Sequence, residues 1–436
     1  MMQKLRELFR IFIDFSTMQL IPYVVPAFFF LLLMELFYNY KKKANYFRLN
    51  DSINDMSLGL MQVVMSLFLN VILIAFYHYV FVNFSVQALF NIPEISESSV
   101  LWYVLSIFIV DHQYYWFHRH CHEVNILWAT HEVHHQSEEY NLTVALRQGI
   151  FQVSVTFIYF IPIAVMGIPT EMFLFAYIFG IFYQYWIHTR TIKKMPAWFE
   201  WLLNTPSHHR VHHGRNPKYI DRNHAGIFML WDRMYGSFKE EEEEPIYGIT
   251  QPVDNWNPIK QNFNYFKFLF KNAMATKSYW DKIRIWFMPV GWRPADVGPK
   301  LEPKEIDMST YKKFNPPLSK SVGIFVLIQL GLLGLAFPFL SLYSEQVSLL
   351  KITGIAAIYI WTLINMGELM VSNRKAVISD LFRNLTLLAL IFIQFRQEEY
   401  FYIIAAVSTL TVVFNLLFLK QIKFNNKTAE GDVALG

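Results

Sequence analysis

The chain has 436 residues, of which 54% are apolar and only 17% are charged, and its net charge is +4. Soluble globular proteins carry about a quarter of charged residues, so this composition argues against a soluble protein and predicts a chain that buries much of its surface in lipid. The small net charge, without a basic stripe interleaved with aromatic residues, excludes nucleic acid as a partner.

Uncharged or nearly uncharged runs of membrane-spanning length recur along the chain. The hydrocarbon core of a bilayer is about 30 Å thick, and a helix of roughly 20 residues crosses it. Nine such runs predict nine transmembrane helices, at 20–39, 56–82, 99–117, 148–167, 170–188, 322–342, 348–367, 377–395 and 400–419. The expected fold class is therefore an all-α multi-pass membrane protein with the bilayer as a partner.

The positions of basic residues predict the orientation of these helices, because Lys and Arg favour cytoplasmic ends. Residues 41–43 are all Lys and follow the first run, and Arg190 follows the fifth. The segments 118–146 and 189–320 then lie on the same cytoplasmic face. The segment 189–320 has no spanning run and is predicted to form a cytoplasmic cap. The host membrane is expected to be the endoplasmic reticulum or a bacterial inner membrane.

The distribution of apolar runs predicts that the chain divides into four parts. Residues 1–98 are expected to form N-terminal transmembrane helices, and residues 99–320 a catalytic region with its cap. Residues 321–424 are expected to form C-terminal transmembrane helices, and residues 425–436 a polar tail.

Histidines cluster in the middle of the chain: 13 of the 14 lie between His112 and His224. They recur three or four residues apart, a spacing that places side chains on one face of a helix. The groups are His118 with His122, His131 with His134 and His135, and His209 with His212 and His213. Gln184 and His188 share a fourth such face.

This histidine pattern is typical of a metal centre. Neutral imidazole is a common ligand for iron, copper and zinc. Eight or nine imidazoles packed without metal would repel one another when partly protonated. One zinc ion takes about four ligands, so this number suffices for two ions. Two metals, nitrogen ligands and membrane burial favour redox iron, and the cap is therefore expected to hold a diiron site on the cytoplasmic face.

Two other functions fit parts of the pattern. His131 to His135 also matches HExxH, the zinc protease motif in which the glutamate is the general base, although His134 would then be idle. A histidine-lined metal transporter or sensor is the third alternative, but a transporter would spread its ligands along the membrane normal. Metal analysis separates the three: two irons for an oxygenase, one zinc for a protease, and labile, variable metal for a transporter.

At these motifs the sequence resembles the fatty acid hydroxylase (sterol desaturase-like) superfamily, whose signature combines HxxxH or HxxxxH, HxxHH and a later HxxHH. It is most similar to the alkylglycerol monooxygenase branch, through the stretches YYWFHR, HEVNILWATHEVHHQSEEYNLTVALRQ, YQYWIHT and NTPSHHRVHHGRNPKYIDRNHAGIFMLWDRMYGSF. The detailed resemblance covers about residues 100–295.

The resemblance implies two iron ions held by nine histidines. These are His118, His122, His131, His134, His135, His188, His209, His212 and His213. Gln184 stands where related hydroxylases have a further histidine, so one iron is expected to have an open or water-filled position. His224 stands where alkylglycerol monooxygenases usually have an aromatic residue, and we expect it to line the pocket, with an extra metal ligand as the alternative. No role is assigned to His208.

Two carboxylates are expected to take part in catalysis. Asp111 is seven residues before His118, on the same helical face, and is predicted to hydrogen-bond a ligand imidazole. Glu123 directly follows His122 and resembles a functionally required glutamate of the family.

The resemblance also implies the reaction. A membrane diiron monooxygenase would use dioxygen and an electron donor, implied to be tetrahydrobiopterin, to hydroxylate a lipid. Hydroxylation beside the ether oxygen of an alkylglycerol would release a fatty aldehyde. The alternative is hydroxylation or desaturation of a fatty acyl chain or a sterol. The lipid is expected to reach the metals sideways from the bilayer, with its head group under the 189–320 cap.

Overall fold

The computed structural model describes residues 21–96, 98–304, 306–307, 309–343, 349–394 and 401–421. Within these ranges the regular structure is helical, apart from three isolated β-bridges. The predicted all-α fold is therefore confirmed for the described part of the chain. The tail predicted at 425–436 lies outside the described residues.

Each of the nine apolar runs forms a helix. These helices are α2 (Ile21–Lys42), α3 (Leu49–Phe84), α5 (Val100–Glu123), α7 (Gln152–Val165), α8 (Thr170–Trp186), α15 (Lys320–Tyr343), α16 (Leu349–Met370), α17 (Arg374–Gln394) and α18 (Phe401–Gln421). The shorter α-helices are α4 (Val86–Phe90), α6 (Asn125–His135), α9 (Ala197–Leu202), α10 (Pro206–His212), α11 (Leu230–Tyr235), α12 (Pro258–Asn262), α13 (Asn264–Ala275) and α14 (Tyr279–Arg284).

Three described segments are long and apolar enough to cross a membrane by length and composition: Leu49–Asn70, Ile72–Phe90 and Leu350–Met370. Helices α7 and α8 have 14 and 17 residues. At about 1.5 Å per residue they measure about 21 and 26 Å, which is less than the roughly 30 Å of a bilayer core. The apolar segments support an integral membrane protein, whereas the count of nine crossings stays a prediction.

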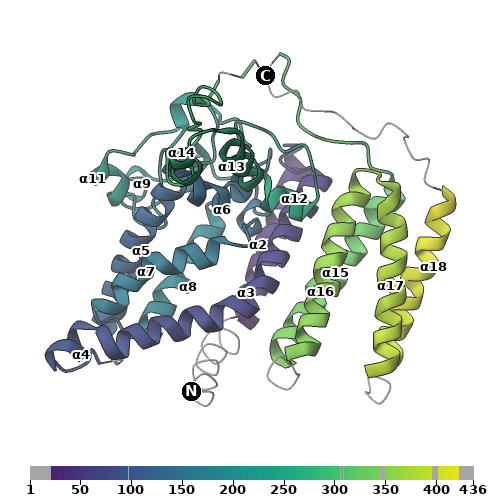
Figure 1. The fold of residues 1–436 in the computed structure, drawn as a ribbon, viewed down its shortest axis with the longest axis horizontal. Coiled ribbons are helices and arrows are strands. Elements are labelled where there is room, and N and C mark those ends of the chain that lie inside the picture. The colour runs from purple at the N-terminus through teal and green to yellow at the C-terminus, as the bar shows by residue number, and fades with distance from the viewer. Residues whose placement is uncertain are drawn as a thin grey trace. The chain divides into compact units, whose positions relative to one another are not determined.

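The chain divides into two compact units. Unit 1 takes the chain up to Val253 together with Asn262–Lys313, and unit 2 takes Asp254–Gln261 together with the chain from Phe314. In unit 2, α15, α16, α17 and α18 pack in sequence, each against the next (Figure 1). In unit 1, α5 packs against α8 and α6, and α3 packs against α7. The short helices α9, α11, α13 and α14 gather at one end of this unit (Figure 1).

Two charged residues of α17 face the interior of unit 2. Arg383 Nη2 lies 2.8 Å from Asp380 Oδ1, and both side chains are buried. The side chains of Gln329, Thr362 and Asn365 bond to this pair. An ion pair whose remaining donors and acceptors are satisfied avoids much of the cost of a buried charge, so the helix can carry both residues.

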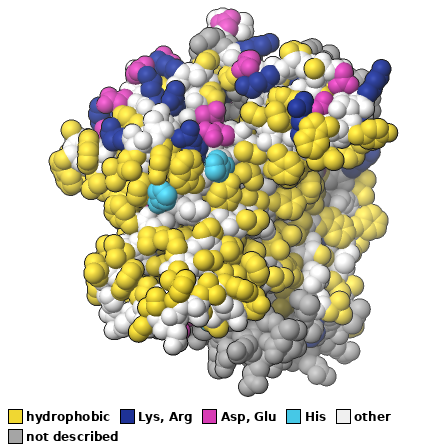
Figure 2. Space-filling view, turned by 60° about the vertical axis from the view of Figure 1, so that its left-hand side comes forward, with side chains coloured by type: hydrophobic (Ala, Val, Ile, Leu, Met, Phe, Trp, Pro, Cys, Tyr) yellow, Lys and Arg dark blue, Asp and Glu magenta, His cyan; other side chains and the backbone are white. Residues whose placement is uncertain are grey.

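Unit 1 leaves many large hydrophobic side chains exposed on its long helices. Examples on α3, α5, α7 and α8 are Ile72, Phe76, Leu101, Ile158 and Ile181. On the face shown in Figure 2, hydrophobic side chains cover a broad area, and the charged side chains gather toward one end of it. Apolar surface of this extent marks contact with lipid or a partner rather than with water.

Candidate metal centre

Four segments of unit 1 bring nine histidines together: the last turns of α5, helix α6, the two residues that follow α8, and helix α10 with the next residue, His213. One group, named cluster A here, consists of His118, His122, His131, His135 and His212. The second group, cluster B, consists of His134, His188, His209 and His213. Within each cluster, one potential ligand atom of every residue lies within 4.8 Å of the others, and all nine side chains are buried.

The HxxHH motifs each serve both clusters. On α6, His131 and His135 face cluster A, and His134 between them faces cluster B. In the motif that begins on α10, His209 and His213 face cluster B, and His212 between them faces cluster A. Positions i+3 and i+4 share the face of position i but lie on opposite sides of it, so each helix can reach two neighbouring sites.

Backbone carbonyls fix the orientation of four of these imidazoles. A carbonyl oxygen only accepts, so the ring nitrogen facing it must donate. His118 Nδ1 donates to His224 O (2.8 Å), and His134 Nδ1 donates to Arg147 O (2.8 Å). His188 Nδ1 donates to Gln184 O (2.7 Å), and His212 Nδ1 donates to Arg222 O (3.0 Å). This tautomer leaves each Nε2 with a free lone pair, as in most metal-binding histidines.

The free lone pairs face one another at short range. His134 Nε2 lies 3.3 Å from His188 Nε2, although both rings carry their proton on Nδ1. Two such lone pairs repel unless a cation lies between them. Two nitrogens that each lie about 2.1 Å from the same metal ion, with a right angle between the two metal–nitrogen bonds, are about 3.0 Å apart. His118 and His131, at 3.1 Å between their Nε2 atoms, show the same spacing in cluster A, so both clusters fit a metal ion.

Burial keeps these rings in the metal-binding form. Desolvation lowers the pKa of His134 to about 4, and it holds the pKa values of His131 and His213 well below the usual range, with neighbouring imidazoles adding to the effect. The neutral ring is the form that binds metal. Among the described residues, the Nε2 atoms of His122, His212 and His213 have no hydrogen-bond partner, which a metal ion would supply.

Comparison with known proteins agrees with this site. The family model described as Fatty acid hydroxylase matches residues 103–237, which include both clusters. Alkylglycerol monooxygenases of Homo sapiens, Xenopus tropicalis and Danio rerio are 36%, 38% and 34% identical over 387, 317 and 383 residues. The alignments cover 86%, 71% and 85% of this chain and 84%, 68% and 82% of those proteins.

The chain belongs to the alkylglycerol monooxygenase family. No solved structure matches it. The predicted resemblance is therefore confirmed.

In this family member, the glutamate of the HExxH motif is engaged in structural hydrogen bonds. Glu132 Oε1 accepts from Gln136 Nε2 (3.1 Å), Asn264 Nδ2 (3.2 Å) and the backbone N–H of Tyr265 (3.1 Å). A general base of a protease must instead face the metal-bound water. Because His134 also belongs to cluster B, the arrangement argues against the zinc protease alternative.

Asp111 has different partners from those predicted. Its carboxylate accepts from the backbone N–H groups of Ile227 (2.8 Å) and Phe228 (3.0 Å) and from Trp231 Nε1 (2.9 Å). The expected hydrogen bond to a ligand imidazole is not among these bonds. Spacing along α5 does not reveal these partners, because only the tertiary structure brings residues 227–231 to the carboxylate. Asp111 thus anchors the segment that follows His224.

Glu123 lies outside both clusters, at the end of α5. Its Oε1 accepts from Arg119 Nε at 2.8 Å, and 40% of its side chain is exposed. Nearby, Asp221 Oδ1 lies 3.8 Å from Nδ1 of the cluster A residue His122. Glu123 is therefore placed at the rim of the centre rather than among the ligands.

Arg147 is a fully buried residue to which the sequence analysis gave no role at the site. Its Nη1 donates to Asn54 Oδ1 (2.8 Å) and Asp55 Oδ1 (3.0 Å), and its Nη2 donates to Gln136 Oε1 (3.1 Å). Its own carbonyl accepts from His134 Nδ1. The available signal was the polar pair Asn54 and Asp55 directly before the apolar run 56–82.

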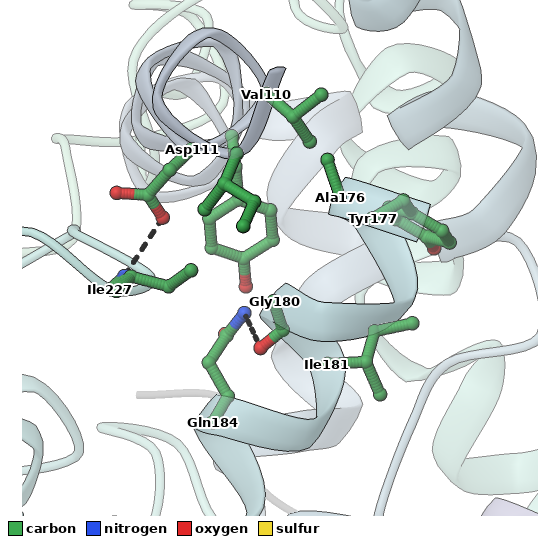
Figure 3. A pocket seen from close by; sticks show the side chains of 10 residues that line it. Val110, Asp111, Ala176, Tyr177, Gly180, Ile181, Gln184 and Ile227 are labelled. Carbon is green, nitrogen blue, oxygen red and sulfur yellow. Dashed lines mark hydrogen bonds between the residues drawn. The ribbon is translucent and has the colours of Figure 1, made fainter. Parts of the chain in front are cut away.

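A pocket lies beside the centre, between α5 and α8 (Figure 3). Its apolar lining consists of Ile107, Val110, Ala176, Tyr177, Ile181 and Ile227. The side chain of Gln184 lines the same pocket and donates to Gly180 O (3.1 Å; Figure 3). Tyr114 also lines it, with its ring centroid 5.3 Å from that of His118. The cavity of about 20 Å³ has room for roughly one water molecule.

Proposed function

We propose that this protein is a membrane diiron monooxygenase that hydroxylates the ether-adjacent carbon of an alkylglycerol and so releases a fatty aldehyde. The observation that carries the proposal is the meeting of nine histidines in two buried clusters, in a chain 34–38% identical to three alkylglycerol monooxygenases. Hydroxylation of a fatty acyl chain or a sterol is the alternative within the same superfamily.

The histidines of clusters A and B are the proposed ligands, with one iron ion in each cluster. When bound, the two ions would activate dioxygen for insertion into a C–H bond. The protein would hold the imidazoles in one tautomer through backbone carbonyls and exclude water by burying all nine side chains. Asp111 is proposed as a positioning residue, because it anchors the segment after His224 rather than reaching the ligands.

The substrate chemistry then balances as follows. One oxygen atom of dioxygen enters the C–H bond beside the ether oxygen, and the other leaves as water with two electrons and two protons from the donor. The resulting hemiacetal breaks its C–O bond to give a fatty aldehyde and glycerol. We propose tetrahydrobiopterin as the donor on family membership alone.

The proposed setting is a chain with nine membrane crossings and its centre under a cytoplasmic cap at 189–320, in the endoplasmic reticulum or a bacterial inner membrane. The apolar helices and the charged end of unit 1 support this setting. In this proposal the chain has four parts, with boundaries at residues 98, 320 and 424.

The direct test is aerobic incubation of the purified protein with an alkylglycerol, tetrahydrobiopterin and dioxygen, followed by assay of fatty aldehyde and of bound metal. We expect aldehyde and about two irons per chain. Hydroxylated acyl chains without aldehyde would move the proposal to the fatty acyl alternative. One zinc per chain with peptide cleavage, or labile and variable metal without turnover, would contradict an oxygenase.

The pocket between α5 and α8 is proposed to receive part of the alkyl chain. A Cβ added at Gly180 meets no atom within 4 Å, so a larger side chain fits there and fills the pocket. Displacing one methylene, at about 0.8 kcal/mol, lowers affinity about fourfold. We therefore expect Gly180→Leu to lower kcat/KM about fourfold for long-chain alkylglycerols and little for chains several carbons shorter.

The matched control for this substitution is Gly331→Leu in unit 2, where an added Cβ also meets no atom within 4 Å. It should leave the chain-length profile unchanged. An equal loss at all chain lengths in Gly180→Leu would show that the pocket does not hold the chain.

Glu123 is proposed to act in proton transfer at the rim of the centre. Such groups contribute about 10²–10⁴-fold, so we expect Glu123→Gln to lower turnover at least about 100-fold while bound iron stays at the wild-type level. Glu240→Gln, on an exposed glutamate, should leave both values unchanged. Turnover of Glu123→Gln within about threefold of wild type would remove Glu123 from the mechanism.

A further inference from the structure

His224 is a buried histidine whose ring has no assigned partner. Its exposed fraction is 0%, and among the described residues neither ring nitrogen has a hydrogen-bond partner. The ring therefore has two unsatisfied nitrogens. Buried nitrogens of this kind are costly unless a ligand satisfies them.

The ring stands at the edge of cluster A. Its centroid lies 5.2 Å from that of His122, 5.7 Å from that of His212 and 5.9 Å from that of His118. Centroid distances between the cluster's own members include 4.4 Å for His118 with His212 and 5.4 Å for His118 with His122. His224 is thus only slightly farther out than the five histidines of the cluster.

The backbone of His224 is held on both sides. Its N–H donates to Asp232 Oδ1 (2.8 Å), and its carbonyl accepts from Nδ1 of His118 (2.8 Å). The preceding residue, Asn223, has a φ of 57°, and its amide bonds to the carbonyls of His208 and Lys239. Asparagine tolerates this left-handed conformation when such bonds fix it. The loop therefore presents the imidazole to cluster A and restricts its movement to rotation of the side chain.

We propose that His224 is a sixth imidazole ligand of the ion in cluster A. Its ring is not among the five whose ligand atoms lie within 4.8 Å of one another, so it binds by turning about its side-chain bonds. Six nitrogens complete an octahedral ion. The ion in cluster B, with four histidines, then keeps the open positions of the centre. This inference rests on the metal centre of the proposed function.

The test measures release of iron from the purified full-length protein, loaded with ferrous iron, to an excess of a ferrous chelator. Wild type is compared with His224→Phe, which keeps an aromatic ring and the carbonyl that His118 uses but removes both nitrogens. Loss of a supporting group at a metal site lowers affinity about 10–100-fold. We expect one of the two irons to leave at least about tenfold faster, with the other unchanged.

The control is His112→Phe, the same change on α5 outside both clusters, where the ring bonds to the Tyr235 hydroxyl at 2.9 Å. Its release rates should equal those of wild type. In His224→Ala, added imidazole should restore slow release, and thermal unfolding of the metal-free proteins checks that each variant folds.

Equal release rates in wild type and both His224 variants would overturn the proposal. Fast release from His224→Ala that imidazole does not slow would also overturn it, because His224 would then act only by packing. A wild-type protein that binds no iron would instead contradict the metal centre itself, so failure of the inference and failure of the proposed function give different results.

Discussion

Substitution of His134 or His212 by alanine should lower turnover by at least about 100-fold while the protein still inserts into the membrane. The two residues belong to different clusters, so in the proposed diiron centre each variant removes one ligand from a different ion. A catalytic metal contributes several kcal/mol to the transition state, and each 1.4 kcal/mol is a factor of ten in rate. Aldehyde formation, iron per chain and recovery in the membrane fraction are the measurements.

The control for these variants is His120→Ala. The His120 ring is half-buried, bonds to the Tyr159 hydroxyl at 3.0 Å and lies outside both clusters. It should keep turnover within about threefold of wild type. Retained turnover in either ligand variant would contradict the assignment of that histidine, whereas absence of the protein from the membrane would leave a folding defect as the cause.

Removal of the Arg147 guanidinium should cause the largest loss of stability. In Arg147→Met the carboxylate of Asp55 stays buried without its ion-pair partner, which lies 3.0 Å away and is only 1% exposed in the native protein. Breaking a buried pair from one side costs about 3–5 kcal/mol. The free energy of unfolding, measured with denaturant in detergent micelles, should fall by this amount. Turnover should fall too, because Arg147 also holds Gln136 at the end of α6.

Two further variants serve as controls for this prediction. Lys300→Met breaks the exposed pair with Glu302 and should change stability by less than about 1 kcal/mol. The double variant Arg147→Met with Asp55→Leu removes both charges and should recover much of the loss, because an apolar replacement of a buried pair is often nearly neutral. Equal stability of Arg147→Met and Lys300→Met would show that the ion pair does not hold the site.

The sequence alone determined the helical architecture and the identity of the converging histidines. Long apolar runs admit only helices in lipid, and all nine runs are helical within the described residues. Histidines three and four residues apart share a helix face whatever the fold around them, so the groups beginning at His118, His131 and His209 could be predicted to point inward together. Their meeting in two clusters agrees with that prediction, and their role as iron ligands is the proposal that follows.

Only the tertiary structure decided how these histidines divide and what holds them. Whether His134 or His135 faces a given cluster depends on the rotation of α6 against α5 and α10, which spacing along one helix does not encode. The carbonyl of Arg147 reaches His134 from the loop that follows α6, and Asp111 holds a loop 116 residues further along the chain. Backbone groups carry no sequence signature, so the tautomers of the ligands and the place of His224 beside cluster A appear only when the packed helices bring them together.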